Sequence, residues 1–195
     1  MAYSGAGRLL IITGASAAGK TTVGYAVAAQ LPRAVHVDGD TVHQFVVSGA
    51  VPMDLPPPPG GEEQLRLRYS GALAVAQVYL RAGFDAVITD NIFEADLIDI
   101  LSLALADVAT ETAYLVMLNP SVGVIRERYA ARPGGGYTDS ITPEGMADAV
   151  ARTPRLGLWL NNGSQTPTES AAEIIGRLGQ AAVSKHDLIA AAGPG

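Results

Sequence analysis

The chain has 195 residues, a formal net charge of −6 and no cysteine. This length is enough for one domain with a sizeable hydrophobic core. The lack of cysteine excludes both a disulfide framework and a cysteine-ligated zinc site, and the acidic balance argues against nucleic acid or an anionic membrane as the main partner.

The composition also bears on location and self-association. No apolar run reaches the roughly 18 residues needed to cross a bilayer, and the lack of cysteine fits a reducing compartment, so we expect a cytoplasmic protein with no membrane partner. Charged residues make up 16% of the chain, below the usual ~25%. A surface with few charges favours self-association, for example as a homodimer. The alternative is that the low charged fraction only reflects an alanine-rich composition.

The first predicted element is a buried parallel strand, a short apolar run over residues 8–13. A glycine-containing turn follows, and residues 21–31 then have the pattern of a helix that Pro32 ends. The turn from Gly14 to Thr21 fits Gly-x4-Gly-Lys-[Ser/Thr], the phosphate-binding P-loop. A strand before the loop and a helix after it are the context that this motif requires. The sequence therefore predicts a nucleotide-binding loop.

The chemistry of this loop suits a triphosphate. Its backbone N–H groups would form an anion-binding nest, and the N-terminus of the following helix adds roughly half a positive charge. Lys20, the single lysine of the first 184 residues, would reach the β- and γ-phosphates, and the Thr21 hydroxyl would ligate Mg²⁺. The residues expected to hold ATP are Gly14, Ala15, Ser16, Ala17, Ala18, Gly19, Lys20, Thr21 and Thr22.

Strand-like and helix-like segments alternate along the rest of the chain, which indicates an α/β fold with a parallel sheet. We expect one domain over residues 1–185 and a flexible tail over 186–195. The further expected strands are 34–37, 85–89, 112–118 and 156–160. The expected helices are 41–48, 62–82, 95–108, 121–131, 143–152 and a last one from Pro167, which follows a capping box.

Three aspartates follow predicted strands: Asp38 and Asp40 after the second, and Asp90 after the third. In parallel α/β sheets, ligands bind outside the carboxyl ends of the strands, where the P-loop also lies. Phosphoryl transfer needs a metal ion between the β- and γ-phosphates and a group that orients the attacking oxygen. Three carboxylates at this edge can divide these roles, although each could instead cap the next helix.

Two segments resemble the P-loop small-molecule kinases. Residues 38–43, Asp-Gly-Asp-Thr-Val-His, resemble the Asp-Gly-Asp segment of gluconate kinase and adenylylsulfate kinase, and residues 81–93 resemble the region around the third strand of chloramphenicol phosphotransferase. The resemblance, which extends to shikimate kinase, implies a P-loop NTPase fold. Its five-stranded parallel sheet would have the order 2-3-1-4-5, lie between helices and carry a lid. The resemblance also implies ATP and Mg²⁺ as cofactors.

Carried over by position, the resemblance gives each acid a role. Asp40 matches the acid that binds and activates the acceptor hydroxyl, Asp38 matches the acid near the magnesium, and Asp90 stands at a Walker-B-like strand end, where it would serve metal or substrate. Whether Asp38 or Asp40 is the base stays open. This chain departs from the pattern at Asn91, where the chloramphenicol enzyme has a second acid, and in the proline run of residues 51–61.

Five of the eleven arginines lie close together in the second half of the chain, and we interpret residues 126–152, which hold four of them, as a lid. Arg128 and Arg132 share one face of a predicted helix. We expect these two to be catalytic, because a closing lid stabilises charge on the moving phosphoryl group and excludes water. The alternative is a set of solvated surface arginines paired with nearby acids.

The predicted function is transfer of the γ-phosphoryl group of ATP to a hydroxyl of a small metabolite or antibiotic. In the expected substrate-binding region, residues 41–82, Arg68 would contact an acidic substrate group, as arginines at this place do in the kinases that the chain resembles. One alternative is a nucleoside or nucleotide kinase, and another is a nucleotide-controlled binding switch that transfers nothing. An AAA-type mechanical ATPase is disfavoured because it would need more chain for its oligomeric lid.

Overall fold

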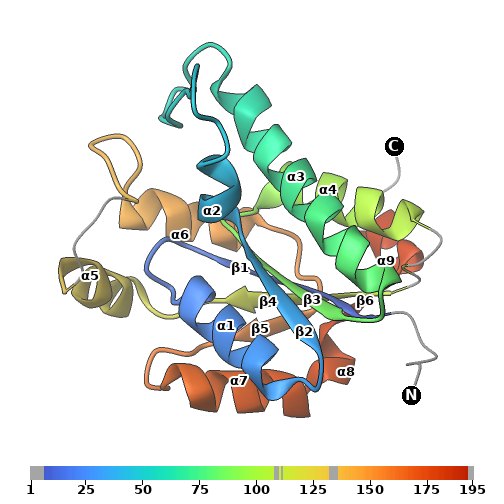
Figure 1. The fold of residues 1–195 in the computed structure, drawn as a ribbon. Helices are drawn as coiled ribbons and strands as arrows, with labels where there is room; N and C mark the ends of the chain where they lie inside the picture. The colour runs from blue at the N-terminus through green and yellow to red at the C-terminus, as the bar shows by residue number, and fades with distance from the viewer. Residues whose placement is uncertain (1–6, 108–109, 111, 132–135, 193–195) are drawn as a thin grey trace.

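The computed structural model describes residues 7–107, 110, 112–131 and 136–192, and Figure 1 shows its fold. The strands are β1 (Leu9–Gly14), β2 (Ala34–Asp38), β3 (Asp85–Thr89), β4 (Ala113–Leu118), β5 (Leu158–Leu160) and β6 (Ala182–Val183). The parallel strands have the order β2-β3-β1-β4-β5, which confirms the predicted topology. The short β6 is an addition to that prediction and pairs antiparallel with the start of β4.

Helices cover both faces of this sheet (Figure 1). They are α1 (Lys20–Gln30), α2 (Gly39–His43), α3 (Gly61–Arg81), α4 (Glu94–Ala106), α5 (Val122–Ala130), α6 (Pro143–Arg152), α7 (Pro167–Gly176), α8 (Leu178–Ala181) and α9 (Lys185–Ala192). One face packs against α3, α4 and α9, and the other packs against α1, α7 and α8. None of these described helices has the length and apolar character that a membrane crossing requires.

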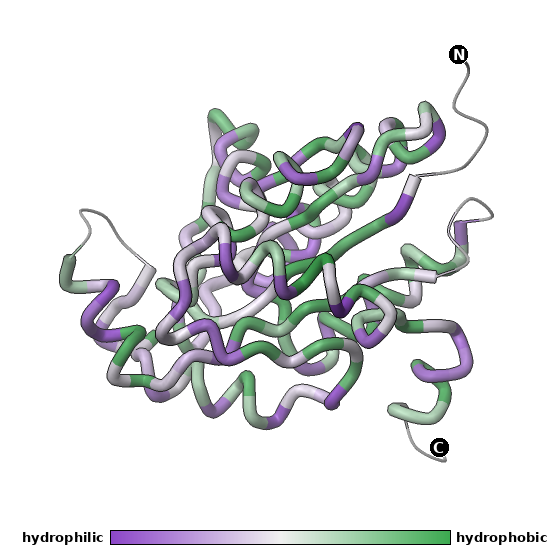
Figure 2. Tube along the Cα trace, turned by 90° about the horizontal axis from the view of Figure 1, so that it is seen from below, coloured by the Kyte–Doolittle hydropathy of each residue, from purple (hydrophilic) through white to green (hydrophobic). Residues whose placement is uncertain are grey.

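The central strand β1 contributes side chains to the core on both faces of the sheet, because side chains alternate between the two faces of a sheet. Leu9 and Ile11 belong to the cluster with α3 and α4, and Leu10 and Ile12 belong to the cluster with α1 and α7. All four are at most 1% exposed. Figure 2 shows the hydrophobic residues that run through the middle of the molecule. Burial of each such side chain contributes roughly 1.5–3 kcal/mol, which holds the strand ends in place.

Helix α9 replaces part of the flexible tail that the sequence predicted over residues 186–195. Ser184 and Asp187 form a capping box: the Ser184 backbone N–H donates to the Asp187 carboxylate, and the Asp187 N–H donates to the Ser184 hydroxyl. Leu188 is 6% exposed and packs into the core cluster that contains α4. The Ser-x-x-Asp spacing is a helix-start signal in the sequence that the tail prediction overlooked.

Helix α2 is shorter than predicted and ends at His43 rather than near Ser48. The next residues give a helix little to bury, because Phe45 is 65% exposed and Val47 is 95% exposed. Isolated helical turns are marginal without a packed apolar face. The chain therefore leaves α2 early and continues into the proline-rich loop before α3.

Strand register brings the predicted functional segments to one edge of the sheet. β1 ends with Gly14 opposite Leu118 of β4, and β2 ends with Asp38 opposite Thr89 of β3. The P-loop, the Asp38–Asp40 turn and the segment after β3 thus all leave the sheet at its carboxyl edge. This is the position at which open α/β sheets bind ligands.

Candidate active site

The P-loop has the backbone geometry of an anion-binding nest. Ala17 has φ 63° and Gly19 has φ 98°, both in the left-handed region, so the loop alternates its backbone handedness. Gly14 allows the loop to pass tightly over β4, because a Cβ there would lie 2.4 Å from the carbonyl oxygen of Leu118. Helix α1 begins at Lys20, directly after Gly19. Its positive N-terminal end therefore faces the space that the loop encloses.

Lys20 and the two following threonines lie where the motif predicts them. The Lys20 ammonium donates to the carbonyl oxygen of Ala15 at 3.0 Å, across the loop. The Thr22 hydroxyl donates to the carbonyl oxygen of Gly19 at 2.9 Å, and the Thr21 hydroxyl donates to Asp38 Oδ1 at 3.3 Å. The structure thus brings Thr21 and Asp38 together, two of the three residues that the sequence assigns to the metal.

This donor set suits magnesium. Among the described residues, no three His, Asp or Glu side chains lie close enough together to hold a metal ion by themselves. Mg²⁺ in nucleotide sites needs no such cage, because it keeps several waters and binds one or two carboxylates together with the phosphates. A threonine hydroxyl beside a carboxylate at the P-loop fits that requirement.

Asp38 is held by a series of side-chain hydrogen bonds that the sequence analysis did not predict. The Thr89 hydroxyl donates to Asp38 Oδ1 at 3.1 Å, and His36 Nε2 lies 2.9 Å from the same hydroxyl. Because the hydroxyl gives its one hydrogen to Asp38, His36 is the donor in that second contact. Burial lowers the pKa of His36, and the nearby Asp38 charge opposes that shift. These two hydrogen bonds orient the Asp38 carboxylate towards Thr21.

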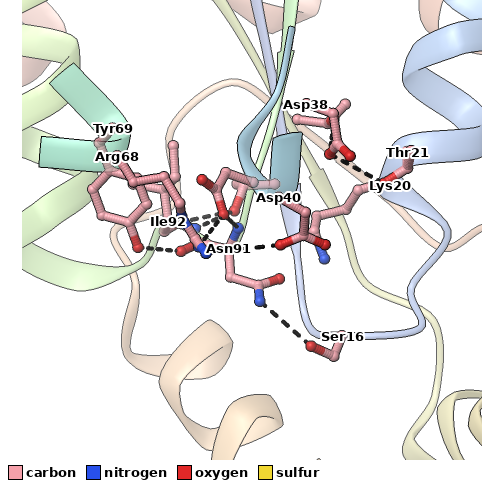
Figure 3. Close-up of polar contacts among 12 residues, drawn as sticks. Ser16, Lys20, Thr21, Asp38, Asp40, Arg68, Tyr69, Asn91 and Ile92 are labelled. Atoms are coloured by element: carbon pink, nitrogen blue, oxygen red, sulfur yellow. Dashed lines mark hydrogen bonds and ion pairs between the residues drawn. The ribbon is translucent and has the colours of Figure 1, made fainter. Parts of the chain in front are cut away.

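Asp40, Arg68 and Asp90 come together beside the P-loop. The Arg68 guanidinium forms an ion pair with Asp90 through Nη2, and its Nη1 lies 3.7 Å from Asp40 Oδ1. The side chain of Asp90 is 3% exposed, that of Arg68 is 15% exposed and that of Asp40 is 80% exposed. In Figure 3 the Asp40 carboxylate lies between Arg68 of α3 and Lys20 of the P-loop.

Asp90 is held by hydrogen bonds at one of its two carboxylate oxygens. Its Oδ1 accepts from Arg68 and from the Asn91 backbone N–H, the latter at 2.7 Å. Its Oδ2 is buried against Gly39, where an added Cβ would lie 1.9 Å from that oxygen, and it has no hydrogen-bond partner among the described residues. Burial raises the pKa of Asp90, and the Arg68 charge is the largest opposing influence. The structure therefore gives Asp90 a partner, Arg68, that the sequence had assigned to the substrate.

Asn91 and Tyr69 complete this side of the site, and neither was a predicted site residue. The Asn91 side-chain amide points at the P-loop, where its Nδ2 lies 3.4 Å from the Ser16 hydroxyl oxygen (Figure 3). The Tyr69 hydroxyl donates to the Asn91 backbone carbonyl oxygen. Tyr69 lies next to Arg68 on α3 and is 5% exposed. The position after Asp90 drew attention in the sequence as a departure from related kinases, and it proves to contact the phosphate loop.

The lid prediction can be followed at Arg128, whereas Arg132 lies outside the described residues. The Arg128 guanidinium donates to three backbone carbonyl oxygens: Ala18 at 3.0 Å, Asn162 at 2.8 Å and Gly163 at 3.3 Å. The Asn162 side chain also donates to the Ala18 carbonyl oxygen, at 2.9 Å. Arg128 thus ties the P-loop to the segment after β5, next to the start of α1.

The remaining contacts between lid and P-loop are largely apolar. Tyr129, Tyr137 and Met146 pack against Ala15 and Ala17 of the loop. The Tyr137 hydroxyl donates to the Ser16 carbonyl oxygen at 2.7 Å.

Two other lid arginines pair with acids and do not face the loop. Arg126 pairs with Glu144, and Arg152 pairs with Glu94. Of these described lid arginines, Arg128 is the one bonded to the P-loop, and the predicted catalytic role of Arg128 and Arg132 over a triphosphate stays a prediction.

The proline-rich loop reaches the lid and lines a hollow on the far side of α3 from Arg68. Asp54 Oδ1 accepts from the Thr138 hydroxyl at 3.1 Å and from the Ser140 hydroxyl. A hollow of about 630 Å³ beside this loop is lined by residues 57–60 and by the outward residues of α3. Arg68 points to the opposite side of that helix, so the hollow does not open onto Asp40.

Comparison with known proteins agrees with this geometry. A family model described as an AAA domain matches residues 9–153, which include the P-loop, the three aspartates and the lid. A search of curated proteins finds no significant match.

Solved structures match nearly the whole chain. An APS kinase from Mycobacterium tuberculosis, in complex with AMPPNP and APS, is 18% identical with a TM-score of 0.67 and covers 88% of this chain and 97% of its own. A sugar kinase from Janibacter sp. HTCC2649 is 17% identical with a TM-score of 0.65, and the match covers 90% of this chain and 96% of the sugar kinase. A tunicamycin resistance protein from Deinococcus radiodurans is 14% identical with a TM-score of 0.62, and the match covers 91% of this chain and 98% of the resistance protein. The predicted resemblance to the P-loop small-molecule kinases is confirmed at the level of the fold.

Proposed function

We propose that this chain, which belongs to the AAA domain family over residues 9–153, is an ATP-dependent kinase that phosphorylates a hydroxyl group of a small molecule. The observation that carries the proposal is the position of Asp40. Its carboxylate is 80% exposed and lies at the carboxyl edge of the sheet, between Arg68 and the P-loop lysine (Figure 3). A base for an incoming hydroxyl has to be open to the acceptor on one side and close to the phosphate loop on the other.

In the proposed reaction, Asp40 orients the acceptor hydroxyl and takes its proton. A bond forms from the acceptor oxygen to the γ-phosphorus, and the bond from that phosphorus to the β–γ bridging oxygen breaks. Lys20 and the backbone N–H groups of the P-loop stabilise the charge on the oxygens of the phosphoryl group. Arg128 holds the loop in this shape through the Ala18 carbonyl oxygen.

Thr21 and Asp38 are the residues proposed to hold magnesium, because their side chains meet at the P-loop. When bound, the ion would neutralise charge on the β- and γ-phosphates. His36 and Thr89 keep the Asp38 carboxylate directed at that position. Asp90, the third residue that the sequence assigned to the metal, is buried beside Gly39 and is paired through its Oδ1 with Arg68, so we give it the role of counter-ion to Arg68. Because ATP is the proposed donor, the proposed setting is the cytoplasm.

The family description, an AAA domain, does not itself name a reaction. The solved structures reported above are matched over at least 96% of their own length, and two of the three carry the word kinase in their titles. Support for a kinase over a mechanical ATPase therefore comes from chains of similar size with the same topology. The nucleotide kinase and the nucleotide-controlled switch are treated as outcomes of the test.

The test is mass spectrometry of a panel of hydroxylated metabolites and antibiotics incubated with the protein, ATP and Mg²⁺. The expected result is that one panel member gains one phosphoryl group. In Asp40→Asn the rate of this transfer should fall by about 10²–10⁴-fold, while the affinity of the variant for ATP stays near that of the wild type. Asp99→Asn, an exposed aspartate of α4, serves as the matched control. Transfer at a near wild-type rate in Asp40→Asn would refute Asp40 as the base, and ATP hydrolysis with no phosphorylated product would favour a switch.

A further inference from the structure

Lys20 of the P-loop and Arg68 of α3 are described cations beside Asp40 (Figure 3). Lys20 would serve the donor phosphates, and each arginine of α3 faces an aspartate on α4 or in the segments that flank it. Arg66 lies 3.7 Å from Asp96 and Arg81 lies 2.5 Å from Asp107. Arg68, the one directed at the transfer site, is paired with Asp90. Their positive charge is therefore directed at acids of the protein itself.

Arg68 is held in that pairing. Its side chain is 15% exposed and that of Asp90 is 3% exposed, so the pair is largely shielded from water. Separating a buried ion pair leaves a charge without compensation, which is strongly unfavourable. A carboxylate or phosphate on the acceptor would have to compete with Asp90 for this guanidinium, and it would also lie beside the Asp40 carboxylate, 3.7 Å from Arg68 Nη1.

The lid offers no compensating cation among the residues that the structure describes. Arg126 is paired with Glu144, and Arg152 is paired with Glu94. Arg128 donates to backbone carbonyl oxygens of the P-loop and of the segment after β5. Apart from Lys20, which would serve the donor phosphates, the described residues around the acceptor position leave Asp40 as the dominant exposed charge.

We infer that the acceptor carries no carboxylate or phosphate near the hydroxyl that is phosphorylated, and that it is a neutral polyhydroxyl compound or a cationic amino alcohol. This inference rests on the proposed function. It narrows the acceptor class and sets aside nucleoside monophosphates, whose phosphate would need an unpaired cation. It also reverses the sequence-based expectation that Arg68 receives an acidic substrate group.

The first test measures binding and does not require the true acceptor. The protein is saturated with AMPPNP and Mg²⁺, and calorimetry follows the titration of gluconate against sorbitol and of AMP against adenosine. The wild type is expected to bind each anionic probe at least about 10-fold more weakly than its uncharged counterpart, a difference of about 1.4 kcal/mol. Asp40→Asn is expected to gain at least a few-fold in affinity for the anions, because it removes the repelling charge, whereas Asp99→Asn is expected to gain nothing.

Two results would overturn the inference: an anionic probe that binds the wild type as tightly as its neutral counterpart, or an Asp40→Asn variant that gains no affinity for anions. The transfer panel gives an independent reading. Neutral or cationic products support the inference, and a phosphorylated acid at an equal or higher rate contradicts it. A panel without any phosphorylated product contradicts the proposed kinase activity instead, and the binding series separates that failure from a wrong acceptor charge.

Discussion

The two sides of the proposed site are built differently. The phosphate side is made of one continuous segment, Gly14 to Thr22, whose backbone supplies most of the polar groups. The acceptor side is made of single side chains from three segments: Asp40 of α2, Arg68 of α3 and Asp90 after β3. A continuous backbone site can be predicted from a local motif. A site assembled from side chains depends on which charges the fold brings into contact.

The largest effect is expected on the phosphate side, from Lys20→Met. This change removes the ammonium that spans the loop to Ala15 and that would stabilise the moving phosphoryl group. Loss of one such electrostatic contact costs about 10³-fold in kcat, or about 4 kcal/mol. Single-turnover kinetics with the acceptor found in the panel measures it. If Lys20→Met kept more than about a tenth of the wild-type rate, the phosphate side would not have the largest effect on transfer.

On the acceptor side, Arg68→Met is expected to destabilise the fold by about 3 kcal/mol, because it leaves Asp90 buried without its partner. Urea unfolding measures the change. Arg66→Met is the matched control on the same helix, since Arg66 is 65% exposed and pairs with Asp96 at 3.7 Å; it is expected to cost less than about 1 kcal/mol.

The same variant has a defined pH dependence. Burial raises the pKa of Asp90 above its ordinary value, and Arg68 opposes this, so removing Arg68 raises it further. A carboxyl whose folded pKa is raised favours the folded state at low pH and disfavours it as pH rises through that pKa. The deficit of Arg68→Met should therefore be largest at alkaline pH and shrink as pH falls towards the ordinary pKa of aspartate. A deficit that grows on acidification would show that Asp90 is not the affected group.

These residues also explain how far the sequence could go. The P-loop is specified by a local motif with fixed spacing and the strands by local apolar runs, whereas the strand order came from the resemblance to the P-loop small-molecule kinases; that order is confirmed. The pairing of Arg68 with Asp90 joins residues 22 positions apart in the sequence, and no spacing rule distinguishes it from a pairing of Arg68 with substrate. The helix start at Ser184 was within reach, because Ser-x-x-Asp is a local signal.

A smaller effect is expected from Arg128→Met, which tests whether the phosphate side depends on a side chain as well as on its backbone. The change removes the donor to the Ala18 and Asn162 carbonyl oxygens. Charge-assisted hydrogen bonds of this kind are worth roughly 1.5–3 kcal/mol, so ATP–Mg²⁺ affinity should fall about 10-fold, as measured by calorimetry. Arg81→Met, at the far end of α3 and paired with Asp107, should leave it unchanged. Equal affinities in the two variants would mean that the loop holds its shape without Arg128.

The smallest effect is expected at Asp54, where the proline-rich loop contacts the lid. Its carboxylate joins the proline-rich loop to Thr138 and Ser140, which lie between α5 and α6. The contact is solvent-exposed, and exposed polar contacts stabilise little. Asp54→Ala should therefore raise KM for the acceptor by about two- to threefold and leave the ATP affinity unchanged. Hydrogen bonds from Ser140 lower the pKa of Asp54, so the contact should persist in mild acid and be lost only below the ordinary pKa of aspartate. Asp139→Ala, an exposed aspartate between the two hydroxyls, is the control of equal charge. An equal KM change in both variants would assign the effect to net charge, and a change in ATP affinity would mean that this contact acts on the phosphate side.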